Sequence, residues 1–327
     1  TCSNYGHSWS YRSRPESCTA GTRGGGERFF RRAPARNDDG RPNSKDGRLS
    51  TPSAAHKSAT SASNDGRGAV LRVAEWNVIH GLYKREVELC RLLKSAKIYI
   101  IYLTEIDQTD IRGNFNIPNY TTFYPLEDST KKDEKIRIVC LARSNSTVTY
   151  TVRNDLMTPD ESSIWIEART KEGTKFLIGG FYRVWNQRGD TTMEGQINRI
   201  GILCNQIQKA CEESSRVIAV GDANLCMEKW NDPQYRYQQI ATKLKCTLDT
   251  NDLLVQQFGK TFFSNHVDEN GHQSTSAIDH AYVSRECRVS CVRTLPKGSS
   301  DHLPIVVEIC LNTKTTSKHV RYITKRS

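Results

Sequence analysis

A long succession of short apolar segments separated by polar turns most constrains how this chain of 327 residues can fold. Segments such as LRVAEWNV at 71–78 and IYIIYLTE at 98–105 are rich in aliphatic and aromatic residues, which is typical of buried strands. Helical periodicity is rarer, and it predicts helices at 84–96, 193–213 and 233–244. Many strands with few helices argue against a regular βαβ repeat, so we predict an α+β layered fold with mixed sheets.

The remaining strands follow from similar apolar runs. They are predicted at 136–142, 147–153, 163–169, 175–182, 216–222, 261–264, 278–284, 287–293 and 304–311. The polar segment NHVDENGHQS, which contains His266 and His272, is expected to be a solvated loop.

The flanks differ in composition from the central segment. Residues 1–70 hold 12 Lys/Arg and 6 Asp/Glu, and residues 313–327 hold 5 Lys/Arg and no acid, which leaves 30 of each sign between them. Such polar, low-complexity segments bury too little apolar surface to offset chain entropy. We predict a disordered basic leader at 1–69, a folded domain at 70–312 and a basic tail at 313–327. Basic flanks suit a nucleic acid, although a solvated tail without a partner explains them equally well.

Cysteine usage and hydropathy narrow the class of protein. The 11 cysteines are scattered, mostly within apolar runs, and they show no CxxC pair and no zinc-ligand spacing. This pattern indicates reduced core thiols in an intracellular protein. No apolar run approaches the roughly 18 residues of a membrane span, and no signal peptide is evident. We therefore expect neither a membrane partner nor a disulfide framework.

Polar residues stand at the ends of six predicted strands. In chain order they are Asn77, Glu105, Tyr182 with Arg183, Asp222 with Asn224, Asp279 with His280, and Asp301 with His302. One strand-terminal Asp is usually a turn residue, but six positions that mix acids, amides, a phenol and imidazoles are hard to assign to turns alone. Strand ends are also where a rigid sheet presents side chains to a shared cleft, so we predict that these residues converge.

Phosphodiester hydrolysis is the chemistry that suits this set. Mg²⁺ takes oxygen ligands, typically one or two carboxylates, and Glu105 and Asp301 are the candidates. Such a cation offsets negative charge on a phosphoryl group. We predict that Asp222 orients or deprotonates the attacking water, and that Asp279 fixes the tautomer of His302.

The other strand-end residues have supporting roles in this interpretation. Asn77 and Asn224 can donate hydrogen bonds to phosphate oxygens or hold the base in place. Tyr182 can support the leaving oxygen or a phosphoryl oxygen. Because side chains alternate along a strand, His280 should face away from the site and be structural.

Six motifs in a fixed order resemble those of the endonuclease/exonuclease/phosphatase superfamily. They are WNV (76–78), LTE (103–105), GGFYR (179–183), GDAN (221–224), SAIDHAYVS (276–284) and SDHLPI (300–305). Each motif is weak alone, but their shared order and spacing are specific. The resemblance covers about residues 70–312. It implies the DNase I-like fold, a four-layer α/β sandwich in which two mixed sheets are flanked by helices.

Within that superfamily the chain looks most like the apurinic-type endonuclease domains of non-LTR retrotransposons. This likeness rests on the residue sequences of the last two motifs and on Tyr182-Arg183 after the GGF strand. It implies DNA as substrate, Mg²⁺ or alternatively Mn²⁺ as cofactor, and nicking of one strand to leave a 3′-hydroxyl for reverse transcription. It also implies a reverse transcriptase in the same polyprotein, of which this chain is then a fragment, and access to the nucleus, although we read no import signal.

The resemblance assigns the site residues to three groups. The implied metal ligands are Asn77, Glu105 and Asp301. The implied catalytic residues are Tyr182, Asp222, Asn224, Asp279 and His302. The implied phosphate or DNA contacts are Asn77, Arg183 and Thr261.

The chain departs from the family pattern just after Asn77. Ile79 stands where the family often has an acid or an amide, and one extra residue precedes Gly81. Either a metal ligand is missing, or His80 is displaced into its role.

Two other hypotheses remain open. A hydrolase of the same fold that acts on phospholipid or inositol phosphate would be expected to carry a His at the position of Tyr182 or an apolar membrane-facing loop, and neither is seen. A decayed copy that only binds nucleic acid is favoured by Ile79. The retained acids Glu105, Asp222 and Asp301 argue against it.

Overall fold

The structure is a computed structural model that describes residues 69–108, 111–127, 135–144, 146–159, 162–185 and 192–311. The predicted tail, and the predicted leader apart from Ala69, lie outside the described residues.

Two six-stranded mixed sheets occupy the centre of the described region. The first has the order β13-β14-β1-β2-β4-β3 and the second the order β5-β6-β7-β8-β12-β9. The first sheet comprises β1 (Val70–Asn77), β2 (Ile100–Gln108), β3 (Tyr120–Phe123), β4 (Ile136–Arg143), β13 (Val289–Thr294) and β14 (Ile305–Cys310). The second comprises β5 (Val148–Val152), β6 (Ser162–Thr170), β7 (Lys175–Tyr182), β8 (Val217–Asp222), β9 (Leu253–Val255) and β12 (Asp279–Ser284). Each sheet contains a parallel pair, β1 with β2 and β7 with β8.

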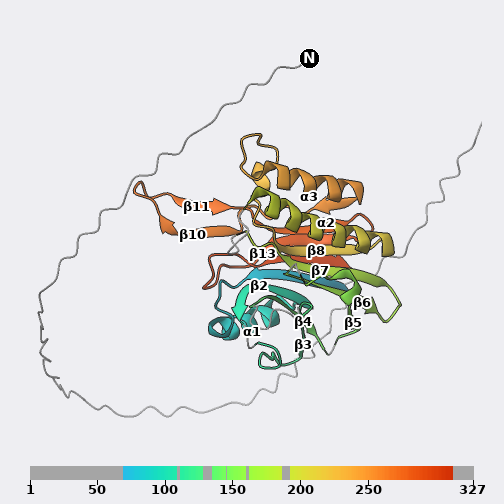
Figure 1. Cartoon of the computed structure of the whole chain (residues 1–327). Coiled ribbons are helices and arrows are strands. Elements are labelled where there is room, and N and C mark those ends of the chain that lie inside the picture. Colours follow the sequence, from blue (N-terminus) through green and yellow to red (C-terminus); the bar gives the residue numbers. More distant parts are fainter. Residues whose placement is uncertain are drawn as a thin grey trace, which may run out of the picture. The chain divides into compact units, whose positions relative to one another are not determined.

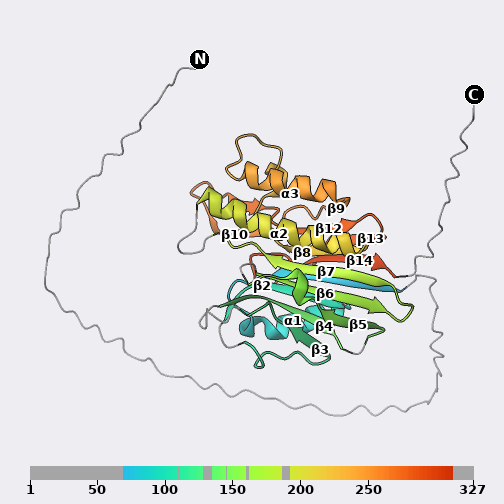
Figure 2. The same ribbon diagram turned by 45° about the vertical axis from the view of Figure 1, so that its right-hand side comes forward.

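Helices cover the outer faces of both sheets, as Figures 1 and 2 show. Helix α1 (Glu86–Ser95), which follows the short 3-10 helix η1 (Tyr83–Arg85), buries Leu89 and Leu93 in an apolar cluster with the first sheet. Helices α2 (Met193–Glu213) and α3 (Gln238–Thr250) cover the second sheet, and two further 3-10 turns are η2 (Asn154–Leu156) and η3 (Met227–Lys229). The predicted four-layer α/β sandwich is therefore confirmed.

The two sheets approach closely where Tyr102 of β2 meets β7. The Tyr102 hydroxyl donates a hydrogen bond to the carbonyl oxygen of Ile178 at 2.8 Å. A Cβ atom on Gly180 would lie 1.9 Å from the Tyr102 ring, and one on Gly179 would lie 2.6 Å from the Trp165 ring. Gly180 is thus required by close packing of the two sheets, which brings together the strands that carry Glu105 and Tyr182. Gly179 instead makes room for the Trp165 ring on β6, the neighbouring strand of the same sheet.

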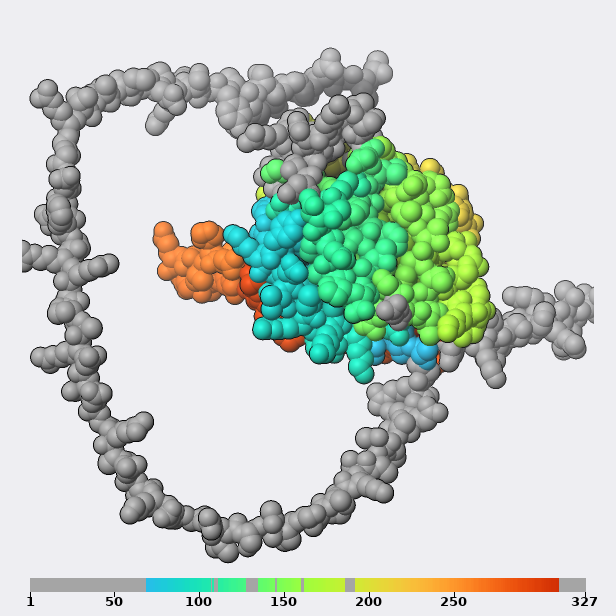
Figure 3. All heavy atoms as spheres, turned by 90° about the horizontal axis from the view of Figure 1, so that it is seen from below, coloured from blue at the N-terminus to red at the C-terminus, as the bar shows by residue number. Residues whose placement is uncertain are grey.

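A two-stranded hairpin projects from the sandwich (Figures 1 and 3). It consists of β10 (Phe262–Val267) and β11 (Gln273–Ser276), which pair antiparallel. The polar segment at 265–274 is solvated as predicted, but it is not all loop, because it holds the last three residues of β10 and the first two of β11. Most of its side chains are exposed, so the hairpin lacks the apolar alternation that marks a half-buried strand.

Other differences from the predicted elements are small. The short strands β3 and β9 were not predicted, α3 spans Gln238–Thr250 instead of 233–244, and β2 runs three residues past Glu105, to Gln108. Helix α2 has its predicted bounds, and the Thr192 hydroxyl caps it by accepting a hydrogen bond from the Gly195 N–H at 3.1 Å. The nine described cysteines are free of disulfides, as expected.

Candidate active site

Asn77, at the end of β1, connects the two sheets at the site. Its side-chain amide donates to Glu105 Oε2 at 2.8 Å and to Asp222 Oδ2 at 2.9 Å. Its Oδ1 accepts from the N–H of Ile79 at 3.0 Å, which fixes the orientation of the amide. Glu105 lies on β2 of the first sheet and Asp222 on β8 of the second. The structure therefore brings these two predicted site carboxylates together from opposite sheets.

Asp222 is buried with a second carboxylate beside it. It pairs with Asp279 across β8 and β12, and its Oδ1 accepts from the Asn224 N–H at 2.8 Å. Burial, and then the charge of Asp279, raise the pKa of Asp222 to about 7, although the charge of His302 opposes this shift. A carboxyl group with a pKa near neutrality is suited to accept a proton from water.

Asp279 and His302 form a buried pair next to Asp222. The Nδ1 atom of His302 lies 2.9 and 3.0 Å from the two oxygens of Asp279. Burial lowers the pKa of His302, but the Asp279 carboxylate, with help from Asp222 and Glu75, raises it overall to about 10. The imidazole is therefore positively charged near neutral pH, and its Nε2 remains for another partner.

Asp222, Asp279 and His302 offer ligand atoms within 4.8 Å of one another. This is the one such group of three among the described residues, and Glu105 and Asp301 do not belong to it. The predicted metal ligands therefore do not form a closed cage.

Asp301 nonetheless fits a nearby cation. Its Oδ1 is buried and has no hydrogen-bond partner among the described residues, and His302 Nε2 lies 3.8 Å from it. Burial raises the pKa of Asp301, and the charge of Glu105 raises it further while that of His302 lowers it. A buried carboxylate oxygen without a donor is costly, and a divalent cation with its waters can satisfy it. The oxygen donors of Glu105 and Asp301 thus fit a hard divalent cation.

Sequence reasoning missed Glu75, which lies behind the site. It sits in the middle of β1, is 0% exposed, and accepts a hydrogen bond from the Thr104 hydroxyl at 2.7 Å. Burial, followed by the charges of Asp279 and Asp222, raises the pKa of Glu75 well above its ordinary value. The available signal was an acid inside the otherwise apolar strand LRVAEWNV.

Tyr182 lies at the end of β7 and is almost completely buried. Arg137 of β4 donates to its hydroxyl at 3.2 Å and stacks over its ring. Burial and the charges of Glu105 and Asp222 raise the pKa of Tyr182, so the phenol keeps its proton. Arg137 was not predicted as a site residue, because it lies within β4 and no recognisable motif surrounds it.

Two predicted phosphate contacts are corrected by their burial. Arg183 and Thr261 are both 0% exposed. The Arg183 guanidinium donates to the carbonyl oxygens of Ala223 and Asn224, so it holds the loop after β8. The Thr261 hydroxyl accepts from the Asp279 N–H at 3.2 Å. Both side chains support site residues from within the protein and leave no surface for DNA.

The remaining predicted residues have clear positions. Asn224 has φ 49°, and its amide donates to the carbonyl oxygen of Arg183 at 3.0 Å. His280 is structural as predicted: it is 0% exposed, lies 2.6 Å from the Tyr282 hydroxyl, and burial lowers its pKa to about 4. Trp185 is 48% exposed at the end of the described part of this segment.

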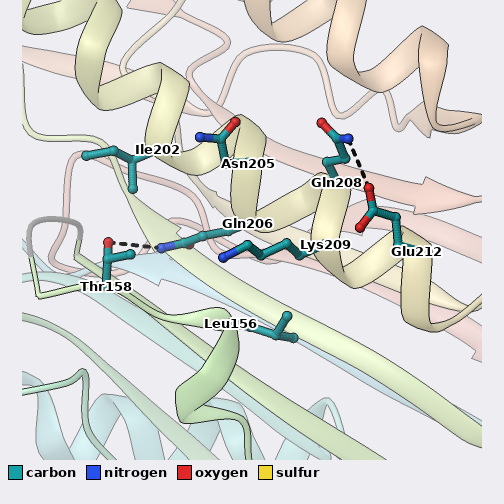
Figure 4. Close-up of a pocket in the computed structure, with 8 residues that line it drawn as sticks. All are labelled: Leu156, Thr158, Ile202, Asn205, Gln206, Gln208, Lys209 and Glu212. Atoms are coloured by element: carbon teal, nitrogen blue, oxygen red, sulfur yellow. Dashed lines mark hydrogen bonds between the residues drawn. The ribbon is translucent and has the colours of Figure 1, made fainter.

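A surface cavity of about 350 Å³ lies against α2, apart from these residues (Figure 4). It is lined by Leu156, Thr158, Ile202, Asn205, Gln206, Gln208, Lys209 and Glu212, none of which is a predicted site residue. Among the described residues, no helix has the length and apolar character needed to cross a membrane.

The buried charges predict how the stability of the cation-free protein depends on pH. The folded-state pKa is raised from 3.8 to about 7 for Asp222 and from 6.5 to about 10 for His302. Each raised pKa adds a stabilising free energy that is complete below the pKa of the unfolded state and is lost as the pH rises through the pKa of the folded state. Stability should therefore fall with increasing pH between 3.8 and about 7 for Asp222, and between 6.5 and about 10 for His302. Urea unfolding in a chelator measures this, and Asp222→Asn should make the lower step smaller, because the raised pKa values of Glu75 and Asp301 still contribute to it. A stability that rises from pH 4 to 7 in the wild type would contradict the prediction.

Comparisons with known proteins agree with this fold. Residues 181–306 match a family described as endonuclease-reverse transcriptase, and no curated protein matches the chain. The endonuclease domain of TRAS1, a telomere-specific non-LTR retrotransposon, is 18% identical with a TM-score of 0.56 over 74% of this chain and 100% of that one. The AP endonuclease LMAP from Leishmania major is 12% identical, with a TM-score of 0.59 over 74% of this chain and 88% of that one.

A third similar structure is D. rerio TDP2 complexed with a single-strand DNA product. It is 15% identical, with a TM-score of 0.53 over 75% of this chain and 100% of that one. At these identities the structures establish the fold, and the family match adds the sequence relationship. The chain therefore has the DNase I-like fold, and residues 181–306 are similar in sequence to the endonuclease-reverse transcriptase family.

Proposed function

We propose that this domain hydrolyses phosphodiester bonds of DNA with a divalent cation, Mg²⁺ or Mn²⁺, and nicks one strand. The observation that carries the proposal is the bridge from the Asn77 amide to Glu105 and Asp222. This bridge holds Glu105, a candidate cation ligand, next to Asp222, a candidate general base. The Asp279–His302 pair beside them supplies positive charge in the same place.

Asp222 acts as the base in this mechanism. With a pKa near neutrality, it takes a proton from the water that attacks phosphorus. The Asn224 N–H and the Asn77 amide hold its two oxygens, so the carboxylate is oriented before substrate arrives.

His302 and Tyr182 stabilise negative charge on the reacting phosphate. Asp279 holds Nδ1 of His302, which leaves the charged imidazole to donate from Nε2 to a phosphoryl oxygen. Tyr182 remains protonated and can donate from its hydroxyl. A cation held by Glu105 and Asp301 would add a positive charge against a phosphoryl oxygen.

DNA as substrate rests on the family match and on the fold shared with the TRAS1 endonuclease domain. By the same resemblance, the product would carry a 3′-hydroxyl for reverse transcription. A reverse transcriptase in the same polyprotein and access to the nucleus are further parts of this proposal.

The test is nicking of supercoiled plasmid by the purified chain with Mg²⁺ or Mn²⁺. We expect open circles whose 3′ ends a DNA polymerase extends, and no nicking in a chelator. Glu105→Ala should remove the activity, whereas Glu86→Ala, which changes an exposed acid on α1, should keep it. Equal nicking by wild type and Glu105→Ala would mean a contaminating nuclease and would end the proposal, as would no nicking with either cation.

A further inference from the structure

The turn after β1 places His80 beside Glu105. Ile79 and His80 have φ values of 41° and 53°, a left-handed conformation that is unusual for a β-branched residue such as isoleucine. The His80 N–H donates to the Glu105 carbonyl oxygen at 2.7 Å, and the Ile79 N–H donates to Asn77 Oδ1 at 3.0 Å. Strained backbone of this kind persists only where surrounding contacts impose it. The extra residue in this turn therefore has a defined place in the structure.

The side chains of His80 and Glu105 then meet on the open side of the site. Oε2 of Glu105 is occupied by the Asn77 amide, whereas Oε1 lies 3.4 Å from His80 Nε2. This separation is long for a charge-assisted hydrogen bond, which is about 2.7–2.9 Å. Two ligand atoms that each lie about 2.1 Å from one cation are about 3.0–3.4 Å apart. The exposed fractions of 48% and 22% leave both side chains accessible to an ion.

The described residues supply two ligand atoms at this point, one from His80 and one from Glu105. Among the described residues, no third His, Cys, Asp or Glu offers a ligand atom within 4.8 Å of both atoms. Asp301 would reach this cation through a bound water, and further waters and a substrate phosphate would fill the remaining positions, as in catalytic metal sites, which keep an open position.

We infer that His80 is a nitrogen ligand of the cation at Glu105, so that this site prefers a first-row transition-metal dication such as Mn²⁺ to Mg²⁺. Imidazole suits transition metals, whereas Mg²⁺ demands oxygen ligands. The inference rests on the proposed function, which assigns the cation to Glu105. His80 thus fills the place that Ile79 leaves without a polar side chain.

Mn²⁺ binding to the full chain tests this without measuring activity. Titration followed by electron paramagnetic resonance gives the affinity, competition with Mg²⁺ gives the selectivity, and electron spin echo modulation detects a nitrogen bound to Mn²⁺. Loss of an outer-shell partner alone costs about 10–100-fold in metal affinity, so His80→Ala should weaken Mn²⁺ binding by at least about 10-fold. His80→Asp should lower the ratio of Mn²⁺ to Mg²⁺ affinity. His266→Ala, which changes an exposed histidine on the hairpin, is the matched control.

The variants separate the inference from the proposed function. Glu105→Ala should abolish tight Mn²⁺ binding, and if it does not, the cation site of the proposed function is itself wrong. If Glu105→Ala abolishes binding but His80→Ala leaves the affinity and the nitrogen signal intact, only the role of His80 fails. Direct ligation would also be overturned if His80→Ala weakened Mn²⁺ binding but the wild type showed no signal from a bound nitrogen.

Discussion

Asp222→Asn is expected to lower the rate of strand nicking by about 10²–10⁴-fold, the range that a positioned general base contributes. The asparagine has the size of the aspartate, and its oxygen can still accept the Asn224 N–H that Asp222 Oδ1 accepts at 2.8 Å, although its amide nitrogen cannot accept the bond that Asn77 donates to Asp222 Oδ2. It cannot accept a proton from water. The expected loss is therefore in the chemical step, and single-turnover nicking at saturating protein measures it.

The stability of this variant distinguishes lost chemistry from lost structure. In the cation-free protein, Asp222 lies buried next to Asp279, so removing its charge should leave the fold at least as stable. Asp252→Asn is the matched control, because it makes the same substitution at an exposed residue whose side chain forms a surface salt bridge with Arg285. Asparagine also tolerates the φ of 56° at this position. A nicking rate for Asp222→Asn above half that of the wild type would remove Asp222 from the role of base.

The convergence of the site was predictable because several of its residues end buried strands. Asn77 and Asp222 directly terminate β1 and β8, and the sheet determines where such ends lie. In the sequence, such a strand end is visible as an apolar run followed by a polar residue. The parallel pairs β1–β2 and β7–β8 bring neighbouring strand ends to one edge of each sheet.

The direction of a side chain beyond a strand end was not predictable in the same way. Arg183 follows Tyr182, and the motif alone suggested that both face the substrate. In the structure Arg183 turns inward and donates to Gln196 of α2, a partner that no local pattern indicates. Glu75 and His80 were missed or left open for a related reason, since their environment comes from strands and turns distant in sequence. Tertiary contacts therefore decide the residues around the site more than those at its centre.

The charges of the site explain why these contacts matter. Glu75, Asp222 and Asp279 are all buried, and His302 is the positive group that faces them. Like charges in a dry environment disfavour each other, and the ion pair of His302 with Asp279 offsets only part of this repulsion, so the surrounding hydrogen bonds help to hold the cation-free site together. Residues that fix the nearby loops should then be costly to replace.

Arg183→Met is accordingly expected to lower the free energy of unfolding by about 3 kcal/mol or more, because three buried acceptors lose their donor. The change leaves Gln196 Oε1 and the carbonyl oxygens of Ala223 and Asn224 without their donor, and each unsatisfied buried group costs about 1–3 kcal/mol. Urea unfolding measures the loss. Arg91→Met, which removes an exposed arginine from α1, should change stability by less than about 0.5 kcal/mol.

The same variant decides between the burial of Arg183 and its predicted DNA contact. At a temperature where Arg183→Met remains folded, the salt dependence of DNA binding should match that of the wild type, because no phosphate contact has been removed. Nicking should still fall, since Arg183 holds the loop that orients Asn224 and, through it, Asp222. Unchanged stability together with a shallower salt dependence would instead mean that the guanidinium reaches DNA, and the structural role argued for it would be wrong.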